Sequence, residues 1–227
     1  MRRLTTILLL SAAAASPAAA QFYNAPALQM PVLATREYNF VAASGSRAGT
    51  ALLFQWREEL QTPWQFTAEA GLAAPVGANV DTRLIVGAAM AYQATRADAD
   101  FPFDVAFTGG AGFSTGNADK AGPGPHAANG TVVRVPFGAV IGHTFDLDDD
   151  FRLTPFVHPR LSLDRCSSCN AGAAESKVDV DVDLGANLQL TPQVSLRVAG
   201  LIGGTDFLGA TNAVAFSVAW TPKGLRK

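Results

Sequence analysis

The most regular alternation of apolar and polar residues in the chain covers residues 177–190. Every even position in this stretch is aliphatic, and every odd position is charged, polar or glycine. Successive side chains of a β-strand point to opposite faces, whereas a helix would mix the two sets on every face. The stretch therefore predicts one long strand with an aliphatic face and an opposite face that carries Asp179, Asp181 and Asp183.

The same two-residue period recurs along most of the chain and predicts an all-β fold. Glycine, proline and aspartate separate the successive segments, as they do at turns. A segment rich in glycine, proline and alanine, about 116–130, predicts one long loop, and a polar stretch around Cys166 and Cys169 predicts another. We expect ten strands, at about 36–43, 50–60, 64–73, 82–93, 103–115, 131–145, 151–164, 177–190, 194–203 and 211–221.

The lengths of the predicted strands and the positions of the aromatic residues favour strands that cross a membrane. A tilted strand needs about 9–11 residues to span a bilayer, and most of the predicted strands are at least that long. Long and tight connections alternate, as they do in outer-membrane barrels. Aromatic side chains gather at the strand ends with tight turns, where a girdle at the lipid–water boundary would lie. The predicted girdle consists of Tyr38, Trp56, Trp64, Tyr92, Phe103, Phe145, Phe151 and Trp220.

With these features the chain resembles the small outer-membrane β-barrels of Gram-negative bacteria, the class that includes the OmpA transmembrane domain and porin-like barrels. The resemblance covers about 36–221 and is one of pattern. Residues 214–220 resemble the C-terminal targeting strand of that class, although the chain continues beyond Trp220. The resemblance implies a closed antiparallel up-and-down transmembrane β-barrel of about ten strands, with eight as the nearest alternative and both chain ends in the periplasm.

The same resemblance implies a location and two partners. The protein would lie in the bacterial outer membrane, with membrane lipid around its outer face. The barrel-assembly machinery would be its partner during insertion. Residues 1–20 support export, because Arg2 and Arg3, a short apolar run and an alanine-rich cleavage site are typical of a signal peptide. We therefore divide the chain into a signal peptide (1–20), an irregular N-terminal lead (21–35), the barrel (36–221) and a C-terminal extension (222–227).

The polar faces of the predicted strands would turn toward the lumen and bring acids and bases together. Hairpin geometry sets Glu37 across from Arg57, Arg57 near Glu69, and Glu69 diagonal to Arg83, because cross-strand neighbours lie about 5 Å apart. Arg160 should likewise meet Asp181 or Asp183. The predicted lumen network consists of Glu37, Arg57, Glu69, Arg83, Arg160, Asp181, Asp183, His158 and Arg197. Such a network could fill the lumen of a small barrel, or it could line a narrow solute pore.

Composition and motifs argue against several other kinds of function. Without the signal peptide the chain has 15 basic and 19 acidic residues, and no basic patch suggests nucleic acid. The spacing of Cys166 and Cys169 in an exported protein predicts a disulfide, and no further ligands lie near them for a metal site. No histidine has a nucleophile and an acid at a recognisable spacing. We therefore predict no enzyme activity, no cofactor and no metal.

Three functions remain open from the sequence. The first is a structural or surface protein of the outer membrane with a salt-bridged polar lumen. The second is a narrow channel for small solutes. The third is a secreted soluble β-barrel whose aliphatic face would line a pocket for an apolar ligand.

Overall fold

A computed structural model of the chain describes residues 28–45, 49–74, 82–115, 131–170, 173–203 and 213–223. The predicted signal peptide, the first part of the lead, the loop 116–130 with His126 and the last residues of the C-terminal extension lie outside these ranges. Among the described residues, none form a helix that is long and apolar enough to cross a membrane.

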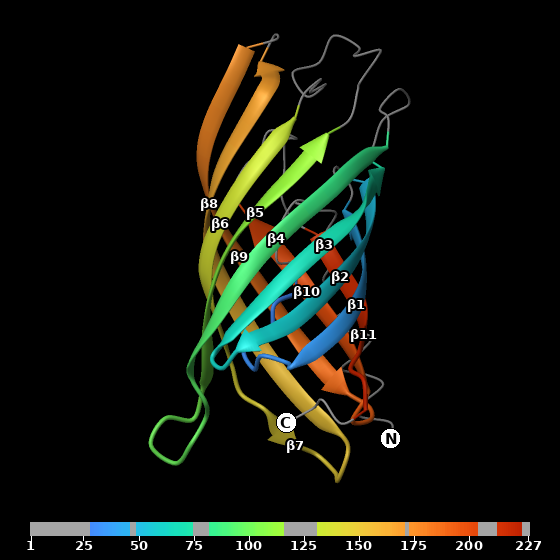
Figure 1. The fold of residues 1–227 in the computed structure, drawn as a ribbon, viewed down its shortest axis with the longest axis vertical. Helices are drawn as coiled ribbons and strands as arrows, with labels where there is room; N and C mark the ends of the chain where they lie inside the picture. The colour runs from blue at the N-terminus through green and yellow to red at the C-terminus, as the bar shows by residue number, and fades with distance from the viewer. Residues whose placement is uncertain are drawn as a thin grey trace.

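The described residues form one closed antiparallel barrel (Figure 1). Each long strand pairs with the next along the chain, and the ring closes where the first strand pairs with the last. Ten long strands make the ring, so the prediction of ten is confirmed and the alternative of eight is wrong. The strands are β1 (Arg36–Gly45), β2 (Gly49–Gln61), β3 (Trp64–Ala74), β4 (Arg83–Thr95), β5 (Asp104–Thr115), β6 (Val132–Gly142), β8 (Arg152–Asn170), β9 (Ala173–Gln189), β10 (Val194–Gly203) and β11 (Ala213–Trp220).

A two-residue strand, β7 (Phe145–Asp146), lies between β6 and β8 in the sequence. It pairs with Leu153 and Arg152 at the beginning of β8, whereas β6 pairs with residues 156–166 of that strand. The single strand predicted over 131–145 is therefore interrupted at His143 and Thr144, and β7 continues the pairing of β6 beyond the interruption.

Alternation along each strand separates a buried face from an exposed one. In β11, Ala215, Ser217 and Ala219 are buried inside the barrel, and Phe216 and Trp220 are exposed on its outer face. In β9 the three aspartates of the most regular stretch are buried, and its valines lie on the outside. Because the side-chain period of a strand is two, a shift of one residue would exchange these faces. The register of the barrel is therefore tied to the polarity pattern of the sequence.

The predicted polar loop around the cysteines is wrong. β8 and β9 continue as one long hairpin up to the pair Asn170–Ala173, and Figure 1 shows this hairpin extending beyond the other strands. Cys166 is a buried residue of β8 that faces Val132 and Glu175 on its neighbours, and it is disulfide-bonded. Buried and exposed residues still alternate here, although many of the residues are small or polar. Arg165 and Ser167 lie on the outer face. The side chain of Cys169 lies outside the described part of the chain, so the pairing of Cys166 with Cys169 stays a prediction.

The second part of the predicted lead, residues 28–35, runs inside the barrel and is called the lumen segment below. Leu28 is fully buried, and its φ of 51° lies in the left-handed region that few leucines adopt. Leu28 and Met30 pack in the same apolar cluster as inward-facing residues of the strands, among them Ala106, Val140 and Phe156. The interior of the barrel is therefore filled partly by its own N-terminal chain.

The candidate site in the lumen and its mouth

The first group of lumen charges centres on Glu37 of β1. Arg57 of β2 donates from Nη1 to Glu37 Oε1 at 3.0 Å, and Arg197 of β10 donates from Nη1 to the same oxygen at 2.8 Å. The side chains of all three residues are at most 3% exposed. Arg197 reaches Glu37 across β11, on which its own cross-strand partner is Ser217. One carboxylate thus serves two guanidinium groups inside the barrel.

Side-chain amides extend this first group along both neighbouring walls. Gln55 accepts from Arg57 at 2.9 Å and from Asn39 at 2.7 Å, and it donates to Glu69 at 2.7 Å. On the other side, Arg197 Nε donates to the Oδ1 atom of Asn187 at 2.9 Å. Buried charges are tolerated when hydrogen bonds satisfy them, and the amides supply those bonds.

The positions of Glu69 and Arg83 show how strand register decides which of the predicted neighbours meet. Glu69 lies opposite Gln55 and diagonal to Arg57, whose own partner across the strands is Thr67. On the other side Glu69 lies opposite Gly87, and Arg83 lies opposite Ala73, further along β4. Arg83 is buried on the inward face, but the register does not make it a diagonal neighbour of Glu69.

A second group lies on the wall formed by β8 and β9. Arg160 donates from Nη2 to Asp183 Oδ1 at 2.5 Å, and Ser162 donates to Asp181 at 2.7 Å. His158 lies opposite Asp183, with Nδ1 at 3.5 Å from the carboxylate, and its Nε2 is 2.9 Å from Thr108 Oγ1. The structure therefore brings together the predicted residues Arg160, Asp183, Asp181 and His158.

A third ion pair, which was not predicted as a pair, joins Arg134 of β6 to Asp164 of β8. The two residues lie directly opposite each other, and Arg134 Nε donates to Asp164 Oδ1 at 2.6 Å while its Nη2 donates to Oδ2. Both side chains are at most 1% exposed. Their inward positions follow from the alternation, but their pairing depends on the register that the connection 143–151, with its short strand β7, sets between β6 and β8.

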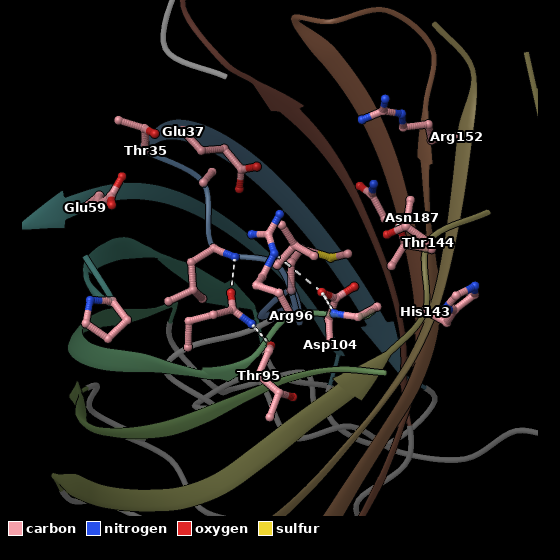
Figure 2. Close-up of a pocket in the computed structure, with 18 of the residues that line it drawn as sticks. Thr35, Glu37, Glu59, Thr95, Arg96, Asp104, His143, Thr144, Arg152 and Asn187 are labelled. Carbon is pink, nitrogen blue, oxygen red and sulfur yellow. Dashed lines mark hydrogen bonds and ion pairs between the residues drawn. The ribbon is translucent and has the colours of Figure 1, made fainter. Parts of the chain in front are cut away.

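The mouth of the barrel is an open cavity of about 740 Å³ next to the lumen segment. Figure 2 shows Glu37 and Glu59 on one side of it and Thr144, Arg152 and Asn187 on the other. Arg96 approaches Asp104 at 3.5 Å, and Arg152 approaches Asp146 at 2.7 Å, so charges at the mouth are also paired. Glu37 and Arg197 border this cavity, which therefore connects to the first group of lumen charges.

Glutamines that sequence reasoning did not single out hold the lumen segment. Gln93 donates to Pro31 O at 2.7 Å and accepts from Leu33 N at 3.0 Å. Gln65 donates to Ala34 O at 2.7 Å. Arg57 donates to the carbonyl of Leu28 at 3.1 Å. The one signal for these roles is that each residue carries several hydrogen-bonding groups and lies on the inward face of a strand.

The predicted girdle residues all lie on the outer face, and several stack in pairs. The ring centroids of Tyr38 and Trp220 lie 5.5 Å apart, and those of Trp64 and Tyr92 lie 4.9 Å apart. Trp56, Phe103 and Phe145 are exposed, and Phe151 is half-buried. His143, at the interruption between β6 and β7, packs edge-on against Phe145 and is hydrogen-bonded to the carbonyl of Pro102.

The chemistry available in the lumen is hydrogen bonding and ion pairing. Thr108, His158 and Asp183 lie in the order of a nucleophile, a base and an orienting acid. His158 is fully buried, however, and none of the three residues borders the mouth cavity. Within the described ranges no group of three or more acidic, histidine or cysteine side chains has the geometry of a metal site.

Comparisons with known proteins add little beyond this geometry. No protein-family model matches the chain, and neither does a curated protein. A solved structure titled "NanC porin structure in rhombohedral crystal form" is similar over 82% of this chain and 100% of that one, at 10% sequence identity and a TM-score of 0.38. This likeness is too low to assign a function.

Proposed function

We propose that the protein is an integral β-barrel of a bacterial outer membrane, with a closed polar lumen and a structural or surface role. The observation that carries the proposal is the inverted polarity of the barrel. Its interior holds ion pairs, amides and the lumen segment, and its outer face is apolar. Water is a poor solvent for such an outer face, and a bilayer is a good one.

The size of the exposed apolar side chains supports lipid as the surrounding medium. Phe40, Leu52 and Phe216 are between 59% and 62% exposed, although they belong to regular, well-paired strands. Leaving apolar surface in water costs about 25 cal/mol per Å², so a continuous belt of this kind is unfavourable in a soluble protein. In a membrane barrel the same belt faces the acyl chains.

At the strand ends that carry the girdle residues, the edge of this apolar belt has the composition of a lipid–water boundary. Glu58 lies two residues after the girdle residue Trp56 in β2. Its carboxylate accepts a hydrogen bond from Trp56 Nε1 at 3.2 Å and another from Arg36 Nε at 2.5 Å. An indole ring with its N–H bonded to a polar neighbour suits the headgroup region, because one end of the ring is apolar and the other is wet. The outer face thus changes from apolar to charged at the girdle.

The polarity of the lumen argues against the secreted soluble barrel. That alternative needs an aliphatic inner face to line a pocket for an apolar ligand. The inner face here instead holds Arg57, Arg134 and Arg160, each buried against acids. A narrow solute channel stays the second candidate, because the mouth cavity of about 740 Å³ leads to the first charge group.

Two measurements on the unaltered protein test the proposal. In carbonate-washed envelopes the protein should stay in the membrane pellet and migrate differently on SDS gels before and after boiling, because closed barrels resist SDS until heated. In planar bilayers the purified protein should produce no steady conductance. Release by carbonate would contradict membrane insertion, and regular stepwise conductance of the unaltered chain would favour the channel.

A further inference from the structure

We propose that the mouth of the barrel is a binding site for an extended peptide, and that the chain's own residues 28–35 occupy it as a removable plug. The inference goes beyond the proposed closed barrel and rests on its insertion into a membrane. It assigns a ligand to the inward-facing glutamines. It also predicts a second state of the barrel, in which the segment has left and the lumen is open.

The contacts to the lumen segment are of the kind that recognises a peptide backbone. Gln93 binds both a carbonyl and an N–H of the segment, at Pro31 and Leu33. Gln65 binds the carbonyl of Ala34, and Arg57 binds that of Leu28. A side-chain amide carries one acceptor and one donor group, as a strand edge does, and so it replaces the partner strand that the segment lacks.

Apolar contacts add a second part to the site. Leu28 and Met30 are almost completely buried among inward-facing residues of several strands. Many of those residues are small, and a barrel of ten strands is wider than the eight-stranded kind that side chains alone can fill. The small wall residues that belong to this cluster are Ala43, Ala51, Ala73, Ala106, Ala199, Ala213 and Ala215.

The way the segment is held makes its departure compatible with an intact barrel. In the described part of the chain, residues 28–34 take part in no strand pairing, and the side chains of barrel residues hold them. At its end beside β1 the segment also accepts a backbone hydrogen bond, from Glu59 N of β2 to Thr35 O at 2.7 Å, so Thr35 can act as the hinge while residues 28–34 leave without breaking a bond between barrel strands. Leu28 would also be released from its left-handed backbone conformation.

Departure of the segment would extend the mouth cavity inward. The space vacated by Leu28, Gln29 and Met30 adjoins Arg57 and Gln65, to which the segment is bonded. Small hydrophilic ions are the solutes that a narrow path past Glu37, Arg57 and Arg197 would admit. The plug would therefore control passage of such ions.

The first test compares two full-length variants in planar bilayers. Gln65→Ala combined with Gln93→Ala removes three hydrogen bonds to the segment backbone, and we expect stepwise openings to become about tenfold more frequent or more. Gln189→Ala is the matched control, because Gln189 borders the same cavity and no hydrogen bond within the described ranges joins it to the segment. It should stay as silent as the unaltered chain. An excess of synthetic peptide with the sequence of residues 28–35 should close the double variant again.

The second test reads the position of the segment directly. A cysteine introduced by Met30→Cys should react slowly with a hydrophilic maleimide in the otherwise unaltered barrel, and about tenfold faster when Gln65 and Gln93 are both alanine. The proposal would be overturned by a double variant whose gel band still shifts on heating, but which produces no openings in bilayers and reacts with maleimide at position 30 as slowly as before. If the double variant does not shift on heating, Gln93→Ala alone is judged by the same two readouts. Failure of the unaltered chain to enter membranes would instead contradict the proposed function.

Discussion

Arg197 donates two hydrogen bonds to the carboxylate of Glu37, although 160 positions separate the two residues in the sequence. The contact joins β10 to β1 across β11, the strand that closes the ring. Because Glu37 of β1 also accepts a hydrogen bond from Arg57 of β2, one buried carboxylate links β2 to β10 across the pairing of β1 with β11. The structure therefore ties the ends of the barrel together by side chains as well as by the backbone pairing of β1 with β11.

Removing this carboxylate should destabilise the barrel strongly. Glu37→Ala leaves Arg57 and Arg197 buried without their shared partner, and breaking a buried ion pair in this way costs about 3–5 kcal/mol. The free energy of unfolding in lipid vesicles, measured by urea titration, should fall by about that amount. Glu58→Gln, which weakens the exposed pair with Arg36, is the control and should leave the titration nearly unchanged. Equal titrations for the two variants would contradict the role given to Glu37.

The pair Arg134–Asp164 offers a test of what the ion pairs contribute. Arg134→Met alone should lower the unfolding free energy by about 3–5 kcal/mol, because Asp164 then stays buried and unpaired. Arg134→Met combined with Asp164→Leu should recover most of the loss, since well-packed apolar residues often replace buried pairs without cost. A double variant as unstable as the single one would show that the two residues do not act mainly on each other.

Two adjacent glycines of β5 should respond differently to the same substitution. A Cβ atom at Gly110 would lie 2.8 Å from both the carbonyl oxygen of Ala88 and the Cβ of Ala89, whereas at Gly109 its nearest neighbour would be 3.7 Å away. Gly110→Ala should therefore destabilise the barrel by about 1–3 kcal/mol through overpacking. Gly109→Ala should be neutral within error in the same urea titration. The reverse order would contradict the strand packing described for β4 and β5.

The strands could be predicted from the sequence because a period of two residues is a local property. Nearly all of the long strands begin and end within a few residues of their expected positions, and β10 has the expected bounds. The ends of β8 and β9 were missed for the same physical reason. Around Cys166 the residues on both faces are small or polar, so the pattern loses contrast although the strand continues.

The lumen contacts that were predicted correctly join strands that follow each other in a hairpin, as Glu37 with Arg57 and Arg160 with Asp183 do. Glu37 and Arg57 lie on neighbouring strands joined by a short connection, so their opposition can be worked out from the sequence. The contact of Arg197 with Glu37 depends on which strands close the ring and on the short side chains between them. The lumen segment has no period at all, and polarity patterns do not indicate where an aperiodic segment lies.

A charge on the outer face separates a lipid environment from water. Leu184 is 49% exposed in the middle part of β9, and Leu184→Arg should cost about 2–4 kcal/mol of unfolding free energy in vesicles. Ser176→Arg is the control, because Ser176 lies beyond the last pair between β9 and β10, Asp181–Gly203, where we expect water. Equal stability of both variants would place the apolar face outside the bilayer.

The most direct measurement uses the three tryptophans of the unaltered chain, Trp56, Trp64 and Trp220. All three are exposed on the outer face, at the girdle end of β2, β3 and β11. In vesicles of brominated phospholipids their fluorescence should be quenched, and bromine near the headgroup should quench more than bromine near the chain end, because girdle residues lie at the interface. Fluorescence that no brominated lipid reduces would mean that lipid does not reach the outer face, and would contradict the membrane barrel.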